Sequence, residues 1–423
     1  MLKNGILTLV TTLICLVVLE FLLRAIAPGD EVSHVLDDEL IYRHAPHREL
    51  RFVRFPEHGG DIIETRFDAH GFREGSGDPL DKSAYRVFVY GDSFIQASYS
   101  RVDDTFAEQL AQRLASDVDR PVTVINAGVD GYGPDQLYLR LLREIPVFEP
   151  DLLVISLFAD NDFGDLIRNK LFRLDAAGRL ERHAFELDEE LLQHYTERQR
   201  LNDAPALVKL VTEPELVRRD LKILLERRLG LSADVFRDVA IDTTYRTSED
   251  FDWIDIWLQR GIQEFEDYVA KGDTRLRLDN LRSDHYDADM TIEPNSDSTR
   301  YKLALMDAVL EAMVGHLHAE GIAVMLLIIP SPIDACTPYD WHVDKERYPD
   351  YDRRLLTRSL VQTASRLDVP YVDLFESFAS DDCNTFFFHH GNNHWNERGQ
   401  ALAADRVADL IRSRGILENA TGR

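Results

Sequence analysis

The sequence predicts an α/β fold, a three-layer α/β/α sandwich built on a parallel sheet. Five short apolar runs rich in β-branched residues recur along the chain, and segments with helical patterns separate them. Near-continuous apolar runs of this kind are typical of parallel strands that are buried on both faces. The five predicted strands are Arg86–Tyr90, Val122–Gly128, Leu152–Phe158, Ala323–Pro330 and Tyr371–Phe375.

The helices between these strands are predicted from end signals and from apolar residues that recur on one face. Thr105 and Glu108 have the spacing of a capping box, and Asn396 can cap a last helix with an apolar stripe. Further helices are expected at Pro134–Glu144, Lys302–Glu320 and Tyr351–Leu367.

The first 27 residues form an apolar segment of their own. Gly5–Leu19 carries no charge, and the apolar character continues past Glu20. About 20 residues of helix are long enough to cross a bilayer core. The segment is either an uncleaved signal anchor or a signal peptide cleaved after Ala25-Ile26-Ala27. Pro28 would hinder cleavage, which favours an anchor over residues 1–27, and both alternatives place the remainder of the chain on the extracytoplasmic side.

Residues 28–84 are expected to be an N-terminal extension, and residues 85–415 the α/β domain. A helical insertion over residues 166–300 interrupts this domain, because no strand of the core type is found there. The aromatic residues of Phe251–Val269 are interpreted as packing residues, and Ser283–Thr299 as a polar loop.

The composition limits the classes of partner. The formal net charge is −27, from 48 basic and 75 acidic residues among 423. Nucleic-acid binding requires clustered Lys and Arg, so a nucleic-acid partner is not expected. Cys15 lies in the apolar segment, which leaves Cys336 and Cys383 as one candidate disulfide in an oxidising compartment.

Candidate functional residues are expected where the parallel strands end, because open α/β sheets bind ligands at their carboxyl edge. Gly91-Asp92-Ser93 follows the first strand, Gly128 ends the second, and Asn161 follows the third. His394 and Trp395 precede the last helix.

These residue types suit acyl transfer. A serine hydroxyl is a weak nucleophile until a base such as His394 removes its proton. The N–H groups of Ser93 and Gly128 and the side chain of Asn161 are candidate donors to an oxyanion, each worth about 3 kcal/mol of barrier. Asp92 and Trp395 are expected to have supporting roles, Asp92 in the loops around Ser93 and Trp395 beneath the histidine loop.

Four motifs in this order resemble the blocks of the SGNH/GDSL hydrolase family: Gly91-Asp92-Ser93, Gly128, Asn161 and His394. The resemblance covers about residues 84–165 and 301–415. It implies a flavodoxin-like α/β/α fold and esterase, deacylase or acyltransferase chemistry without metal or organic cofactor.

The sequence departs from the family pattern beside the histidine. The usual aspartate three residues before it is Gly391 here. A membrane-anchored branch similar to the alginate O-acetylation proteins has an aspartate two residues before, in an Asp-x-His-Trp block, and that position is Asn392. Either Asn392 orients His394, or Asp381 or Asp382 replaces the carboxylate, or the site is weak or inactive.

We therefore expect a serine-dependent esterase that acts on a small-molecule or glycan ester, with an O-acyltransferase as the alternative. A catalytically degenerate glycan-binding or scaffold protein is the non-enzyme alternative. His389, His390 and His394 lack the spacing of a metal site, so no metal is expected.

Overall fold

The computed structural model describes most of the chain. The described residues are 2–26, 33–53, 62–75, 77–117, 120–212, 214, 252–282, 284–336, 341–379, 383–388 and 393–419.

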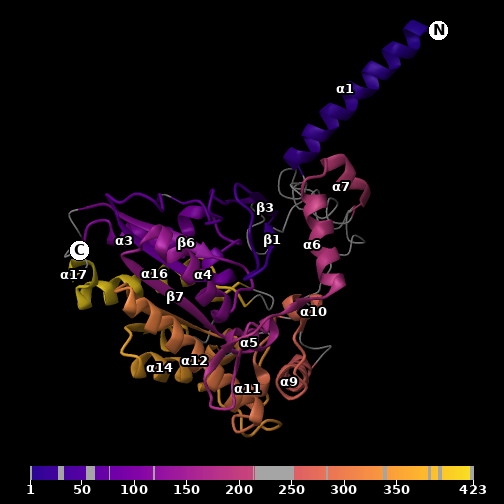
Figure 1. Cartoon of the computed structure of the whole chain (residues 1–423). Coiled ribbons are helices and arrows are strands. Elements are labelled where there is room, and N and C mark those ends of the chain that lie inside the picture. The colour runs from indigo at the N-terminus through magenta and orange to yellow at the C-terminus, as the bar shows by residue number, and fades with distance from the viewer. Residues whose placement is uncertain are drawn as a thin grey trace.

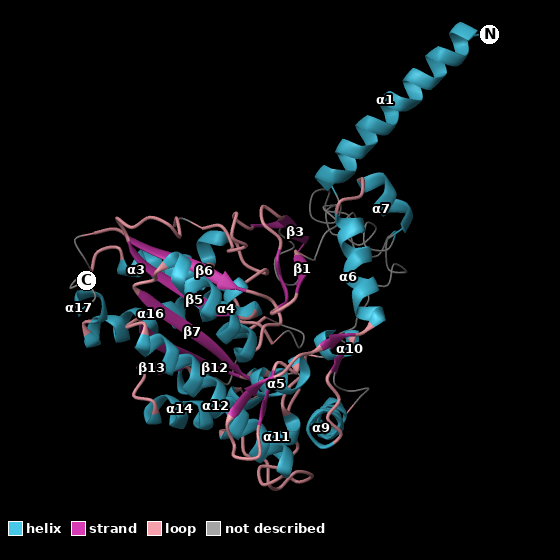
Figure 2. Cartoon of the chain, viewed as in Figure 1, coloured by secondary structure: helices cyan, strands magenta, loops and turns pink. Residues whose placement is uncertain are grey.

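A parallel five-stranded sheet forms the centre of the fold (Figure 2), in the order β13-β12-β7-β5-β6. Its strands confirm the five predicted ones to within two residues at each end, because each is a short apolar run. Their bounds are β5 Tyr85–Gly91, β6 Val122–Gly128, β7 Leu152–Ala159, β12 Ala323–Pro330 and β13 Tyr371–Asp373. Every residue of β5 and β7 is buried.

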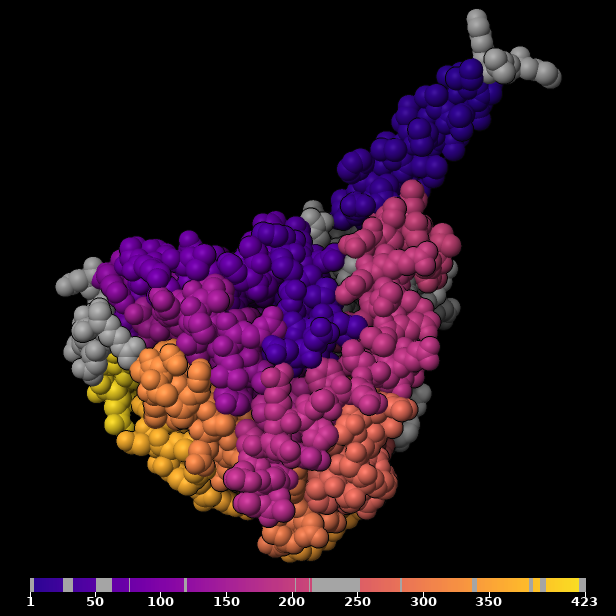
Figure 3. All heavy atoms as spheres, viewed as in Figure 1, coloured from indigo at the N-terminus to yellow at the C-terminus, as the bar shows by residue number. Residues whose placement is uncertain are grey.

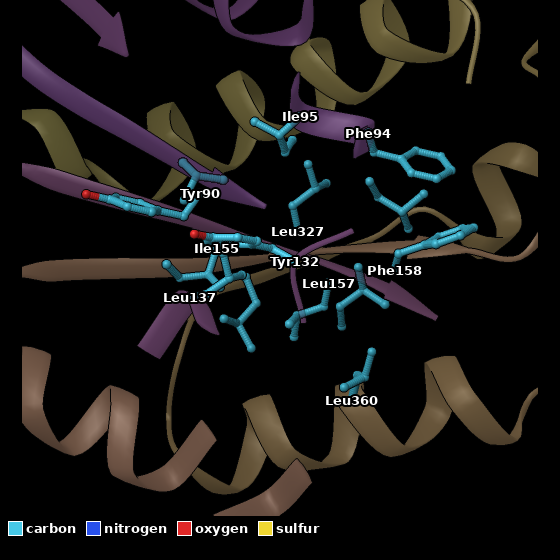
Figure 4. Packing of buried hydrophobic residues seen from close by; sticks show 14 of the residues in the cluster. Tyr90, Phe94, Ile95, Tyr132, Leu137, Ile155, Leu157, Phe158, Leu327 and Leu360 are labelled. Atoms are coloured by element: carbon cyan, nitrogen blue, oxygen red, sulfur yellow. The ribbon is translucent and has the colours of Figure 1, made fainter. Parts of the chain in front are cut away.

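Helices cover both faces of this sheet, which confirms the three-layer sandwich. α4 (Pro134–Phe148), α12 (Asp297–Ala319) and α14 (Leu355–Arg366) pack on one side, and α3 (Phe106–Leu114) and α16 (Glu397–Arg414) on the other. Figure 4 shows Ile95 and Phe94 on one side of the strands and Leu360 of α14 on the opposite side.

The predicted helix caps are present. The side chain of Thr105 accepts a hydrogen bond from the Glu108 N–H at the start of α3. The side chain of Asn396 accepts from the N–H groups of Arg398 and Gly399 at the start of α16.

Helix α1 (Leu2–Ile26) projects away from the α/β domain (Figure 1). Its stretch Asn4–Ala25 has a mean hydropathy of 2.7 and is not buried against the protein. Among the described residues it is the one helix long and apolar enough to cross a membrane.

The N-terminal extension contains two antiparallel hairpins. β1 (His34–Asp37) pairs with β2 (Ile41–His44), and β3 (Glu49–Val53) pairs with β4 (Ile62–Arg66). Arg73 then attaches this extension to the sheet, because its N–H donates to the Asn126 carbonyl of β6 at 3.1 Å. Its buried guanidinium donates to the carbonyls of Gln96, Ala97 and Ser100.

The insertion is only partly helical. Its helices are α5 (Asp162–Asn169), α6 (Glu189–Asn202), α7 (Ala206–Thr212), α9 (Trp253–Phe265), α10 (Leu278–Arg282) and α11 (Ala288–Ile292), and a π-helical turn covers Glu266–Ala270. It also contains four short strands, β8 (Phe172–Leu174), β9 (Leu180–Arg182), β10 (Glu186–Leu187) and β11 (Arg275–Leu276). These strands have two or three residues, too few for an apolar pattern to show.

The prediction of a polar loop at Ser283–Thr299 is wrong. α11 lies within that range, all of its residues are buried, and α12 begins at Asp297. The segment is polar in sequence because it supplies buried carboxylates: Asp287 and Asp289 both accept hydrogen bonds from the fully buried Lys302 ammonium, at 3.1 and 2.8 Å.

Two further packing features lie near the carboxyl edge of the sheet. Trp257 packs edge-on against Trp341 with ring centroids 5.1 Å apart, so this aromatic residue of α9 is a packing residue. A disulfide joins Cys336 to Cys383, whose Cα atoms are 5.6 Å apart. It attaches the segment before the histidine loop to the end of α13 (Pro332–Ala335).

Candidate active site

Ser93 and His394 are brought into hydrogen-bond contact, although 301 residues separate them. The distance between Ser93 Oγ and His394 Nε2 is 2.8 Å. Ser93 is the first residue of the short helix α2 (Ser93–Gln96), directly after β5. A side-chain oxygen of Asp92 caps this helix by accepting from the Phe94 N–H at 2.9 Å. The strand end and the cap together present the serine hydroxyl at the carboxyl edge of the sheet.

The histidine is held by the residues beside it. The carbonyl of His394 accepts from the Phe388 N–H at 3.0 Å. The indole N–H of the buried Trp395 donates to the Phe94 carbonyl at 2.9 Å, which ties the histidine loop to the turn of Ser93. The imidazole ring stacks on Phe94 with centroids 5.2 Å apart and lies 5.1 Å from the ring of Tyr99.

This packing sets the protonation state of the imidazole. Loss of hydration lowers the pKa of His394 to about 4, and the negative charge of Asp284 partly offsets the effect. The ring is therefore neutral near pH 7. A neutral imidazole in contact with a serine hydroxyl can accept its proton.

The backbone N–H of Gly128 does not face an open position, which corrects the oxyanion role predicted for it. This N–H donates to the side-chain oxygen of Asn126 at 3.1 Å. A glycine is required here for a different reason: a Cβ would lie 2.1 Å from the backbone nitrogen of Gln96 and 2.6 Å from the carbonyl carbon of Ile95. Gly128 thus lets α2 pack directly on the end of β6.

Another glycine in the same loop has a free donor. The structure describes every residue of segment 128–133. Within this segment, Gly131 is the residue whose backbone N–H has no acceptor. The N–H groups of Val129, Asp130, Tyr132 and Gly133 donate to Gly91 O, Gln96 Oε1, Val129 O and Gln136 Oε1. Gly131 has a φ of +72°, a conformation that favours glycine. The sequence shows several glycines in this loop, but only the hydrogen-bond pattern distinguishes them.

Asn161 lies after β7, as its place in the sequence predicts, and is the residue directly before α5. Its backbone carbonyl accepts from Asp165 N at 2.8 Å and from the Arg168 guanidinium at 3.0 Å. Its side-chain amide nitrogen donates to a carboxylate oxygen of Asp284. The amide is thus directed to the surface of the domain where Asp284 lies.

Asp284 is a residue of the site that sequence reasoning missed. It lies 123 residues from Asn161, between α10 and α11, in the segment expected to be a polar loop. The carboxylate is exposed, whereas the next three residues are buried and bonded on several sides. Their partners are Glu264 for His285, Asp334 for Tyr286, and Asp160, Gly164 and Lys302 for Asp287.

Buried charges attach this segment to the core. The fully buried Arg168 forms ion pairs with Asp165 at 2.7 Å and Glu264 at 3.3 Å. The pKa of Glu264 is lowered to about 2, because the nearby Arg168, together with His285 and Lys302, outweighs the burial that would raise it. The backbone that presents Asp284 is therefore held by charged contacts to α5, α9 and α12.

Several carboxyl groups beneath Ser93 have raised pKa values. Burial raises the pKa of Asp92 to about 8 and that of Asp130 to about 6, and the Asp284 charge adds to both effects. Burial also raises the pKa values of Asp160 and Asp162, and the latter is raised further by Asp92. The position of Asp92 as a helix cap agrees with its expected supporting role.

Other residues named from the sequence lie outside the described residues. These are Asn392, Gly391, Asp381, Asp382, His389 and His390. The residue that orients His394 thus stays a prediction. Within the described ranges, no three His, Cys, Asp or Glu side chains gather as a metal site.

The C-terminal part of the chain is similar to a known family of domains. Residues 288–423 match the family described as "SGNH hydrolase-like domain, acetyltransferase AlgX". This match confirms the resemblance predicted from the motifs for the part of the chain that contains His394 and Trp395. No curated protein matches the chain.

Solved structures of similar proteins include a lipase/acylhydrolase from Enterococcus faecalis (12% identity, TM-score 0.34, 78% of this chain and 96% of that one). They also include the esterase EstA from Pseudoalteromonas sp. (12% identity, TM-score 0.35, 78% of this chain and 98% of that one). A third is an acetyl xylan esterase from Geobacillus stearothermophilus (11% identity, TM-score 0.35, 78% of this chain and 95% of that one).

Proposed function

We propose that this protein is a serine-dependent esterase or O-acyltransferase, in which Ser93 is the nucleophile and His394 the general base. The observation that carries the proposal is the 2.8 Å contact between Ser93 Oγ and His394 Nε2 at the carboxyl edge of the sheet. Such a contact between nucleophile and base is the geometric requirement of the mechanism. The lowered pKa of His394 keeps the base neutral.

In the proposed reaction, Ser93 Oγ forms a bond to the ester carbonyl carbon while its proton moves to His394 Nε2. The tetrahedral oxyanion accepts hydrogen bonds from the Ser93 N–H, the Asn161 amide and the Gly131 N–H. Gly131 replaces Gly128 in this set, since the Gly128 N–H is donated to Asn126. The imidazolium then protonates the leaving alkoxide, and an acyl-serine remains.

The acyl group leaves by one of two routes. Attack by water releases the free acid, and attack by an acceptor hydroxyl completes a transfer. The same residues support both routes. The matching family is described as an acetyltransferase, which favours transfer as the second candidate function. We propose an extracytoplasmic location, with α1 as the anchor, and therefore an ester of an exported or cell-envelope glycan as substrate.

The test is hydrolysis of p-nitrophenyl acetate by the full chain in detergent. Ser93→Ala and His394→Ala should each lower kcat by at least about 10³-fold, because each removes half of the nucleophile–base pair. Ser413→Ala, an exposed serine of α16, is the matched control and should keep full activity. Asn392→Asp should raise kcat if Asn392 orients the imidazole without offsetting its charge.

Equal rates for Ser93→Ala and wild type would refute the serine mechanism. Folded wild-type protein that releases no acid with or without a hydroxyl-rich glycan acceptor would favour the binding or scaffold alternative. Acid release that falls, with acylated glycan formed, when acceptor is added would identify the transferase.

A further inference from the structure

Helix α7 (Ala206–Thr212) is bonded to the apolar helix α1 through Glu20. The two carboxylate oxygens of Glu20 accept from the backbone N–H groups of Ala206 and Leu207, both at 2.9 Å. One of them also pairs with the Arg24 guanidinium at 2.6 Å. Glu20 is the charged residue that interrupts the apolar stretch, and its charge is satisfied by these three donors.

This contact sets the position of α7 along the axis of the candidate membrane span. The span Asn4–Ala25 has 22 residues, a length of about 33 Å that matches a bilayer core. Glu20 precedes the end of the span at Ala25 by five residues, which is a rise of about 8 Å. If α1 spans a membrane, the first turn of α7 lies about 8 Å inside the end of the span, in the outer part of the acyl-chain layer.

The exposed face of α7 is apolar. Val211 is 79% exposed and Val208 43% exposed, and their spacing of three places them on one side of the helix. The neighbouring surface of α1 is also apolar, with Phe21 69% and Leu22 51% exposed. Figure 3 shows α1 rising directly from the surface that residues of α7 form. These side chains keep 43–79% of their surface exposed.

We propose that α7 is an interfacial helix that rests in the membrane layer where α1 ends, with Val208 and Val211 in contact with lipid. Interfacial helices bury an apolar face about 5–10 Å below the headgroups, which agrees with the position set by Glu20. The partner is the lipid bilayer itself, argued from continuity with α1. This inference rests on the proposed anchor and is independent of the chemistry at Ser93.

The helix before α7 connects α7 to the α/β domain. α6 (Glu189–Asn202) lies between α7 and α10 (Figure 1). The buried Leu191 and Tyr195 of α6 pack on the core, and the ring of Tyr195 stacks on Tyr42 of the N-terminal extension. α6 thus joins the membrane-bound turn to the domain that carries the candidate active site.

The experiment uses the full chain with Cys15→Ser and Val211→Cys, labelled with an environment-sensitive fluorophore and reconstituted in vesicles of phosphatidylcholine and phosphatidylglycerol. Lipids with a nitroxide close to the headgroup should quench the label at position 211 by at least half. A label at Glu190→Cys, exposed near the start of α6, is the control and should show little quenching. The native disulfide is kept by labelling without reductant.

Adding Glu20→Ala should reduce the quenching at position 211 while the protein stays in the membrane, because the bond between the helices is lost. A position-211 label that is unquenched and water-exposed would overturn the proposal. So would an unquenched label in an apolar environment, which indicates a protein partner instead of lipid. A mature protein that lacks the first 27 residues would also overturn it, since Glu20 would be absent.

Discussion

The side-chain amide of Asn161 donates a hydrogen bond to the carboxylate of Asp284. The first residue lies between strand β7 of the central sheet and α5, and the second belongs to the inserted segment between α10 and α11. A negative charge therefore lies beside the amide that we propose as an oxyanion donor. The same charge raises the pKa of His394 against the effect of burial. The insertion thus acts on the electrostatics of the Ser93 site.

The pH dependence of activity should report both effects. A base with its pKa lowered to about 4 stays neutral well below pH 6.5, so kcat/KM of the wild type should keep at least about half of its plateau at pH 5.5. With an ordinary histidine pKa, only about a tenth would remain. Asp284→Asn removes a charge that favours the imidazolium, and the acidic midpoint should move lower still, by less than about one pH unit. Acetate release measured from pH 3.5 to 8 checks both.

Asp279→Asn is the matched control for this change. Asp279 is exposed on α10 and carries the same charge a short distance along the chain. Its removal should leave the midpoint in place. An acidic midpoint near pH 6.5 in the wild type, or an upward move in Asp284→Asn, would contradict the electrostatic description of the site.

Lys302→Met should destabilise the protein strongly. The Lys302 ammonium is fully buried and pairs with Asp287 and Asp289, which would then keep uncompensated buried charges. Removing one partner of a buried ion pair costs about 3–5 kcal/mol, and the thermal midpoint should fall by more than about 6 °C. Differential scanning calorimetry of the full chain measures it.

The control is Lys271→Met. Lys271 pairs with Asp267 at 2.7 Å on the surface, where an ion pair is worth little, so the thermal midpoint should change by less than about 2 °C. Similar shifts for the two variants would show that the cluster at Lys302 does not hold the insertion to the core.

Gly128→Ala should disrupt the site although it removes no functional group. The added Cβ would meet the backbone of Ile95 and Gln96, so α2 and the hydroxyl of Ser93 must move. We expect a loss of esterase activity of at least about 10²-fold, since small displacements of catalytic groups have effects of this size. Gly315→Ala on α12, where nothing lies within 4 Å of the new Cβ, should instead stabilise the protein by up to about 1 kcal/mol.

The sheet and the Ser93–His394 pair could be predicted from the sequence because local signals mark them. The core strands are short apolar runs, and Thr105 and Asn396 are recognisable helix caps. Parallel strands bring their carboxyl ends to one edge, so residues that follow them meet without further information.

Other parts of the site depend on long-range geometry that no local pattern encodes. Asp284 reaches Asn161 because buried partners hold the residues that follow it, and its own surroundings in the sequence are simply polar. The choice between Gly128 and Gly131 as a donor depends on which N–H is already bonded, which follows from the side chains of Asn126 and Gln96. The short strands β10 and β11 pair across the insertion, Glu186 with Arg275 and Leu187 with Leu276.

The buried carboxyl groups with raised pKa values make folding a proton-binding reaction. Burial raises the pKa of Asp92 to about 8 and those of Asp135 and Asp334 to about 7. In the unfolded chain these groups ionise near pH 4, so between pH 4 and 8 the native state holds protons that the unfolded state releases. The contribution of these groups to stability therefore falls as the pH rises through that range. The native protein also carries less negative charge at pH 7 than the formal −27 implies.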